Sequence, residues 1–199
     1  IFFEVLAVDS VRTGVESQRY ASDLSKLGMV RLQRGDSESA YQIQRRALEI
    51  MERVEDPESI RLLSVRTAAG EAARRAGDAE AAVRVLTDAL HRTENAPDDL
   101  PLERSRILTE LALARLAIGD GAPACGHEGA MRGALPPPLR DDWRAGWAEA
   151  VEGLCLVRSG SPGDGESLIR SGQKRLEAAL PAGDLHRREV ESWLERTRG

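Results

Sequence analysis

The sequence predicts an all-α fold built from antiparallel helical hairpins, and three observations support this prediction. The apolar content of the 199-residue chain is mainly Ala, Leu and Val, and only 4% of its residues are aromatic. Ala, Leu, Glu and Arg, which form helices well, dominate its middle part, whereas a β-sandwich needs more β-branched and aromatic residues. A Gly-Asp pair also recurs at a constant interval, with small residues in phase with it.

The Gly-Asp pair is expected to form the turn of each hairpin. Its glycines are Gly35, Gly77 and Gly119, so that 77 − 35 and 119 − 77 both equal 42. Each glycine suits the left-handed position that ends a helix, and Asp36 and Asp78 can then cap the helices that follow. Because turns this short make neighbouring helices antiparallel, the pattern predicts hairpins with a 42-residue period.

Small residues predict where the two helices of a hairpin approach each other closely. Gly28 on the first helix is expected to face Ala40 on the second. In the next copy, Gly70 is expected to face Ala82. Helix axes separated by ~8–10 Å require small side chains at the contact, which these pairs supply.

This arrangement resembles the tetratricopeptide repeat, in which an apolar–small pair, a glycine turn and later alanines recur. The usual period of that family is about 34 residues. The 42-residue period, with its extra length around residues 51–57, is similar to the kinesin-light-chain-like branch. The resemblance implies a right-handed α-solenoid, a superhelix of hairpins whose first helices line a concave face. It also implies a protein or peptide partner and no catalysis.

Four hairpins and two flanking helices are expected along the chain. Residues 1–12 are expected to form the second helix of a truncated upstream repeat, and residues 183–198 a capping helix that covers the last apolar face. Consecutive prolines at 136–138 must end the third hairpin, and the link over residues 159–165 is expected to be longer than the earlier turns. The hairpins, of which the last two are degenerate, are expected at residues 16–54, 57–94, 100–135 and 139–180.

The last hairpin and the cap carry all three tryptophans. Trp143 and Trp147 lie one helical turn apart, with Gly153 in the place of the small residue. The two tryptophans are expected to form the core of the hairpin, and a shelf for a bound peptide is the alternative. Trp193 and Leu194 share the apolar stripe of the capping helix.

No constellation of residues in the sequence favours catalysis or metal binding. There is no Walker loop, nucleophile elbow or HExxH motif. Cys125 and Cys155 lack the spacing of a disulfide framework, and Cys125 with His127 supplies only two of the four ligands of a structural zinc site. The acidic pairs at residues 98–99 and 141–142 suit helix starts. We therefore expect no enzyme activity, catalytic residue, cofactor or metal, with Cys125 or a carboxylate pair as the catalytic alternative.

Charge and hydropathy narrow the class of partner. The net charge of −5 and the pI near 5.4 argue against nucleic acid. No apolar run approaches the ~20 residues of a membrane span, so we expect no membrane contact and a cytoplasmic location. Residues 180–184 and the Trp193-Leu194 pair resemble the ends of repeat tails on large bacterial signalling proteins, including serine/threonine kinases. We thus expect a segment of such a protein, with self-association through exposed repeat ends as an open alternative.

The resemblance also implies which side chains would face a partner in the concave groove. In the family, positions two, five and nine of each first helix point into the groove, and Gly28, Gly70 and Ala112 occupy position eight here. Ser25 and Met29 stand where chaperone-binding repeats carry the Lys and Asn that clamp a terminal carboxylate. The expected groove residues are Ser22, Ser25, Met29, Ser64, Thr67, Glu71, Arg106, Thr109 and Leu113.

Two functional hypotheses follow from this groove. The first is a non-catalytic scaffold that binds a protein or an extended or helical peptide. The alternative is a ligand- or peptide-sensing regulatory domain whose superhelix closes on a small molecule. In that case Met29, Arg106 and the two tryptophans of the fourth hairpin would line its pocket.

Overall fold

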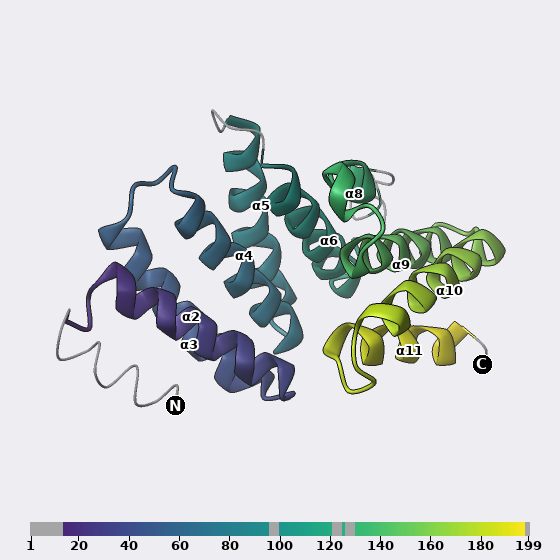
Figure 1. The fold of residues 1–199 in the computed structure, drawn as a ribbon, viewed down its shortest axis with the longest axis horizontal. Helices are drawn as coiled ribbons and strands as arrows, with labels where there is room; N and C mark the ends of the chain where they lie inside the picture. The colour runs from purple at the N-terminus through teal and green to yellow at the C-terminus, as the bar shows by residue number, and fades with distance from the viewer. Residues whose placement is uncertain (1–13, 96–99, 121–124, 126–129, 198–199) are drawn as a thin grey trace. The chain divides into compact units, whose positions relative to one another are not determined.

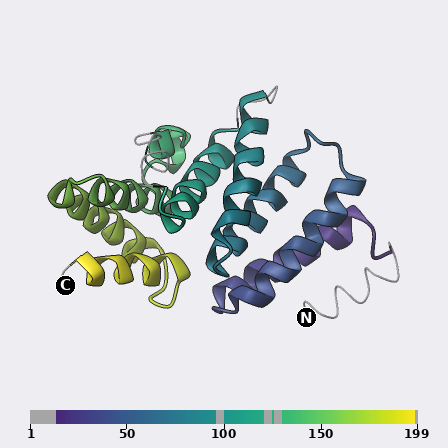
Figure 2. The ribbon, with the colours of Figure 1, turned by 180° about the vertical axis from the view of Figure 1, so that it is seen from behind.

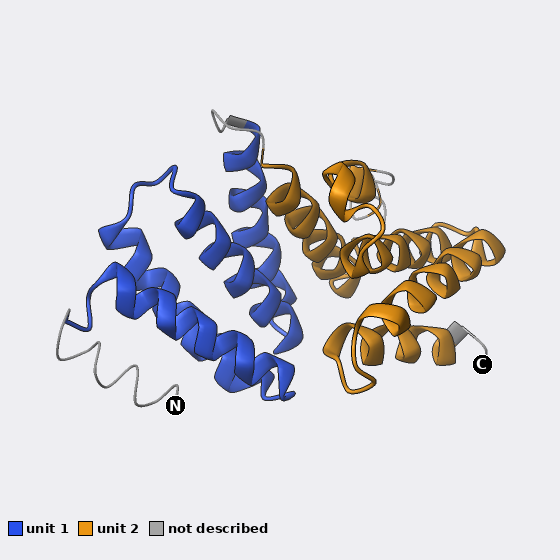
Figure 3. Cartoon of the chain, viewed as in Figure 1, with its two compact units in different colours: residues 1–97 blue, residues 98–199 orange. Residues whose placement is uncertain are grey.

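The computed structural model describes residues 14–95, 100–120, 125 and 130–197. Within these residues the regular structure is entirely helical, so the all-α prediction is confirmed (Figure 1). The chain divides into two compact units, residues 1–97 and residues 98–199 (Figure 3). Residues 1–12, the expected upstream helix, lie outside the described residues, as do residues 98–99 and His127.

Unit 1 consists of two helical hairpins in sequence. Consecutive helices pack against one another, and the first helices of the two hairpins, α2 and α4, also touch. Figure 2 shows the same helices from behind. The core lies between α2, α3 and the start of α4, and includes Leu24, Ile50 and Leu62. The helices are α2 (Gln18–Gln33), α3 (Ser37–Val54), α4 (Ile60–Arg75) and α5 (Ala79–Asn95).

The turn between α2 and α3 shows why the Gly-Asp pair recurs. Gly35 has a φ of +83°, which lets its N–H donate to Leu32 O at 2.9 Å and lets the Asp36 N–H donate to Arg31 O at 3.0 Å. These bonds satisfy carbonyls that the helix end leaves open. Asp36 Oδ1 then accepts from the Ser39 N–H at 3.3 Å and caps α3. The predicted roles of both residues are confirmed.

The same helix ending occurs four times in the described residues. Gly35, Gly77, Gly119 and Gly160 have φ values of +83°, +93°, +81° and +93°. In each case the N–H of the residue after the glycine donates to a carbonyl five residues earlier. Gly160 is followed by serine instead of aspartate, so this turn lacks the Gly-Asp pair of the other three.

The close contact inside each hairpin of unit 1 differs from the predicted one. A Cβ added at Gly28 would meet the side chain of Gln44 first, at 2.8 Å, and not Ala40. A Cβ added at Gly70 would meet Leu86 first, at 2.5 Å. The glycine therefore makes room for a large side chain that comes one turn after the alanine of the second helix. Ala40 and Ala82 are themselves fully buried.

Unit 2 begins with a single long helix and ends with three helices packed together. Ser105 Oγ of the first helix donates to Met131 O at 2.6 Å, which ties the short α8 to it. The α-helical chain stops at Gly133, before the run of prolines. The elements are α6 (Pro101–Ala117), α8 (Ala130–Gly133), the 3-10 helix η1 (Pro137–Leu139), α9 (Trp143–Arg158), α10 (Pro162–Ala179) and α11 (Leu185–Thr197).

The link between α9 and α10 is shorter than the sequence suggested. Helix α9 ends at Arg158 and α10 begins at Pro162, so only residues 159–161 form the turn. The expected longer link over 159–165 is wrong because proline is tolerated in the first turn of a helix. Pro162 starts α10, and the glycines after it belong to the helix.

Four glycines form the contact between α9 and α10. A Cβ on Gly146 would lie 3.0 Å from Gly172 O, and one on Gly172 would lie 2.4 Å from Gly146 O. About two turns further along α9, a Cβ on Gly153 would lie 2.6 Å from Gly165 O. Real Cβ atoms do not approach backbone so closely, so only glycine permits this packing. Gly153 therefore fills the predicted small-residue place, with Gly165 opposite it.

Candidate partner-binding surface

The structure separates the nine expected groove residues between the two units. Six lie on the neighbouring first helices of unit 1, three on α2 and three on α4, and these helices touch. The other three, Arg106, Thr109 and Leu113, lie on α6 in unit 2. Only the α2 and α4 residues are therefore brought together within one compact unit.

Four of the expected residues are too little exposed to offer a side chain to a partner. The exposed fraction is 8% for Ser25 and 0% for Thr67 on unit 1. On α6 it is 2% for Thr109 and 6% for Leu113. The family positions identify one side of a helix, but they do not show which side chains there pack inward.

Internal hydrogen bonds explain three of these burials. Ser25 Oγ donates to Gln44 Oε1 at 2.9 Å, and Gln44 Nε2 donates to Ser25 O at 2.8 Å. Thr67 Oγ1 donates to Leu63 O at 3.0 Å. Thr109 does the same one repeat later, to the carbonyl four residues before it at 2.7 Å. A hydrogen bond to a carbonyl of the preceding turn satisfies a buried hydroxyl, so no group from a bound protein is needed.

The other expected residues in unit 1 are Ser22, Met29, Ser64 and Glu71, which we name the first-helix surface. Met29 is 49% exposed, although it is a large apolar side chain. Ser22 and Ser64 are half-buried, and Ser22 Oγ donates to Gln18 O at 2.9 Å. The surface is therefore small and polar around one apolar contact point.

The charge on this surface is already paired within its helix. Glu71 Oε1 lies 3.2 Å from Nε of Arg75, one turn later, and both side chains are largely buried. Asp23, next to Ser22, accepts from Lys26 Nζ at 2.8 Å. Glu71 and Asp23 thus each have a cationic partner on their own helix. In unit 2, Arg106 Nη1 lies 3.6 Å from Glu103 Oε2.

Three groups with displaced pKa values have structural roles. The hydrogen bond from Ser39 lowers the pKa of Asp36, the cap of α3. Burial raises the pKa of Tyr41, whose hydroxyl donates to Asp78 Oδ2 at 3.0 Å. The hydrogen bond from His186 lowers the pKa of Asp184.

The described residues include only some of the catalytic alternatives, because His127 and residues 98–99 lie outside them. No group of three or more His, Cys, Asp or Glu in that part of the chain could hold a metal ion. Cys125 and Cys155 are both buried, and no disulfide joins them. Asp142 caps α9 by accepting from the Arg144 N–H at 2.7 Å, which confirms its role at a helix start. None of the described helices is long and apolar enough to cross a membrane.

The tryptophans contact the last helix. The rings of Trp147 and Trp193 stack with centroids 5.3 Å apart, and His186 packs edge-on to Trp147 at 4.8 Å. Trp147 is 6% exposed, so the core interpretation is confirmed for it, with α11 as its partner helix. Of the residues that the small-molecule hypothesis names, Met29 belongs to unit 1, and Arg106 and the tryptophans belong to unit 2.

Comparison with known proteins confirms the predicted resemblance. Residues 20–95 match the family model of the tetratricopeptide repeat. A Podosopora anserina protein described as a kinesin light chain with nearly identical TPR-like repeats aligns at 15% identity and TM-score 0.67, over 91% of this chain and 86% of that one. A single-substitution variant of that protein aligns at 16% identity and TM-score 0.65, over 89% of this chain and 86% of that one.

A third solved structure has a similar fold. BtubC (BKLC) from P. vanneervenii aligns at 14% identity and TM-score 0.64, over 98% of this chain and 85% of that one. No curated protein matches the sequence. At these identities the likeness establishes the helical-repeat fold.

Proposed function

We propose that the chain is a non-catalytic scaffold that binds a protein or peptide on the first-helix surface. Its residues 20–95 match the family model of the tetratricopeptide repeat. Repeats of this family generally mediate protein–protein interaction. The fold supports the proposal because α2 and α4 are neighbouring first helices, the elements that line the binding face of such repeats.

The exposed Met29 supplies an apolar contact point on this surface. Its flexible thioether side chain is 49% exposed, and Ser22 and Ser64 of the same surface are half-buried. Methionine adapts to different apolar shapes and is common on binding surfaces. The serine hydroxyls can exchange water for the backbone groups of an extended or helical peptide.

A peptide-selection experiment tests the proposal. Peptides that bind the full chain would be selected from a random library, and their affinities measured for the wild type and for Met29→Glu. We expect Met29→Glu to weaken binding at least tenfold, because it places a charge in the apolar contact. The matched control is Val54→Glu on α3, which changes a side chain of 42% exposure outside the surface and should leave affinity unchanged. Equal losses in both variants, or no enriched peptide, would contradict the proposal.

We also propose that this binding role serves a larger bacterial signalling protein in the cytoplasm. The support is the resemblance of residues 180–184 and the Trp193-Leu194 pair to repeat tails of such proteins. The sequence of the parent gene tests it directly. A kinase or another signalling domain in the same reading frame is the expected result, and an unrelated enzyme domain would contradict it.

A further inference from the structure

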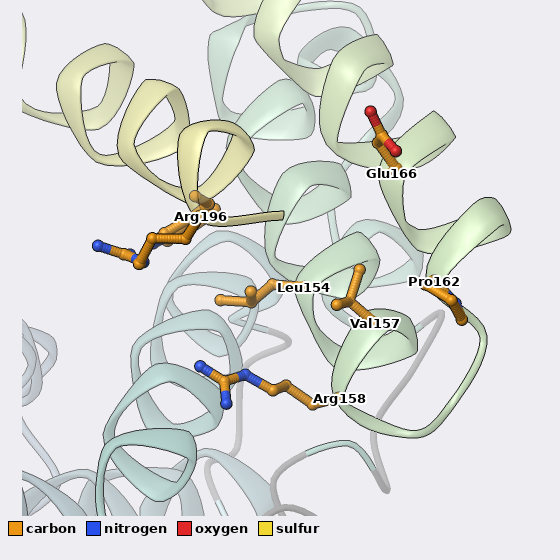
Figure 4. Close-up of a pocket in the computed structure, with 7 residues that line it drawn as sticks. Leu154, Val157, Arg158, Pro162, Glu166 and Arg196 are labelled. Carbon is orange, nitrogen blue, oxygen red and sulfur yellow. The ribbon is translucent and has the colours of Figure 1, made fainter. Parts of the chain in front are cut away.

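A pocket of about 480 Å³ opens between α9, α10 and α11, wholly within unit 2 (Figure 4). Ligand sites in proteins generally enclose about 300–1,000 Å³, so the pocket can hold a few residues of a peptide. Its apolar wall includes Leu154 and Val157 of α9 and Trp193 of α11. Its polar lining includes Arg158, Glu166 and Arg196, one from each of the three helices.

The charge of the pocket is unbalanced. Glu166 is engaged with Arg170, one turn later on the same helix, through an ion pair to Nη2 and a hydrogen bond from Nε at 3.1 Å. Arg158 and Arg196 are both exposed, and neither has an ion pair with another described residue in the structure. The pocket therefore presents two positive charges that its own carboxylate does not neutralise.

The guanidinium groups of Arg158 and Arg196 do not converge on one point, and an aliphatic side chain lies between them (Figure 4). In the view of Figure 4, the labelled Leu154 lies between Arg158 and Arg196. One compact phosphate would be matched best by cations converging on a single point. An apolar wall with a cation on either side is matched better by an aliphatic side chain flanked by two carboxylates.

We propose that this pocket binds an acidic peptide segment in which an aliphatic residue is flanked by aspartate or glutamate. The aliphatic side chain packs on Leu154, Val157 and Trp193, and the carboxylates pair with Arg158 and Arg196. Arginine suits this role because its planar guanidinium can hold a carboxylate through two hydrogen bonds. The site lies entirely in unit 2, so the inference does not rest on the first-helix surface of unit 1.

Titration with a defined peptide tests the proposal on the full chain. The probe is a fluorescently labelled peptide, blocked at both ends, with a leucine flanked by glutamates. The same peptide with glutamines is the comparison. We expect Arg158→Gln and Arg196→Gln each to weaken the affinity about threefold, and the double variant about tenfold, in line with exposed ion pairs. Added salt should weaken binding of the glutamate peptide, because the attraction between exposed charges is screened.

Arg188→Gln is the matched control, since Arg188 is an exposed arginine of α11 that does not line the pocket. It should leave the affinity unchanged. An equal loss with Arg188→Gln would overturn the proposal in favour of a general effect of net charge. Equal affinity for the glutamine peptide would also overturn it, and so would stronger binding of a phosphoserine peptide or efficient competition by inorganic phosphate.

Discussion

At the residue scale, single glycines set the distance between α9 and α10. Each of the four glycines in this contact faces backbone atoms of the opposite helix. Backbone cannot move aside as a flexible side chain can, so a methyl group at these positions must push the helices apart. This differs from Gly28 in unit 1, where the nearest atoms belong to the Gln44 side chain.

Gly153→Ala should therefore destabilise unit 2. The new Cβ would lie 2.6 Å from Gly165 O and 2.8 Å from the Ile169 N, and overpacking of this kind costs about 1–3 kcal/mol. That loss should exceed the gain of about 1 kcal/mol from replacing glycine in a helix. Urea unfolding followed by tryptophan fluorescence measures it, since all three tryptophans lie in unit 2.

Gly163→Ala is the control for this experiment. Gly163 also lies in α10, but nothing stands within 4 Å of the position its Cβ would take. Alanine there should be neutral or stabilise the unit by up to about 1 kcal/mol. If both variants changed the midpoint equally, the close backbone contact would not be the cause.

The start of α11 should make unit 2 sensitive to acid. Asp184 Oδ1 accepts from the His186 N–H at 2.9 Å and lies 3.1 Å from its Nδ1, and the side-chain hydrogen bond lowers the pKa of Asp184. A lowered pKa in the folded state stabilises the protein above the unfolded value of about 3.9, and that stabilisation is lost as the pH falls through the folded value.

Asp184→Asn tests this effect, because asparagine can still cap the helix but carries no charge. The wild type should be more stable than the variant near neutral pH, and the difference should shrink as the pH drops below about 4. Thermal unfolding followed by tryptophan fluorescence at several pH values gives this difference. A difference that stayed constant or grew in acid would show that the carboxylate has no such role.

At the scale of elements, each hairpin of unit 1 depends on a cap and a buried alanine that occur in both copies. Ala40 and Ala82 are fully buried near the starts of α3 and α5. Replacing either with leucine should cost about 1–3 kcal/mol, because the packed hairpin has no space for the larger side chain. Circular dichroism during urea unfolding measures the change. Ala178→Leu, on an exposed position of α10, should have little effect, and neutral results at both buried sites would argue against the hairpin packing.

Local rules explain which elements were predictable. A glycine that ends a helix and an aspartate that caps the next act within a few residues, so Gly35, Asp36 and their copies could be identified from the sequence. The fourth turn was mislocated because Ser161 replaces the aspartate and Pro162 suggested a loop. The glycines of this contact are visible in the sequence as a spacing of seven residues, at 146 and 153 on α9 and at 165 and 172 on α10. Which glycine faces which depends on how the two helices align, and the sequence does not show that alignment.

The candidate site was less predictable for a related reason. Family positions locate the face of a helix, but they do not show which side chains on it are buried. Ser25 and Thr67 are buried and form hydrogen bonds to Gln44 and to the Leu63 carbonyl. Gln44 occupies the space that Gly28 leaves open, which depends on the contact between two helices. The pocket at Arg158 and Arg196 needs three helices of unit 2 together, and no short motif in the sequence indicates it.

At the scale of the whole molecule, each proposed site lies within one compact unit. The first-helix surface belongs to residues 1–97 and the arginine pocket to residues 98–199. Neither site therefore needs a defined arrangement of the two units in order to bind. The two can hold different segments of one partner, or different partners, and linkage of two weak contacts in one chain raises the overall affinity.

Hydrogen–deuterium exchange on the full chain, with and without a selected peptide, tests most directly whether the first helices of unit 1 form the binding surface. We predict slower exchange in segments that cover Ser22–Met29 of α2 and Ser64–Glu71 of α4, and unchanged exchange in α3. Protection confined to α3 or α5, or no protection at saturating peptide, would contradict the account.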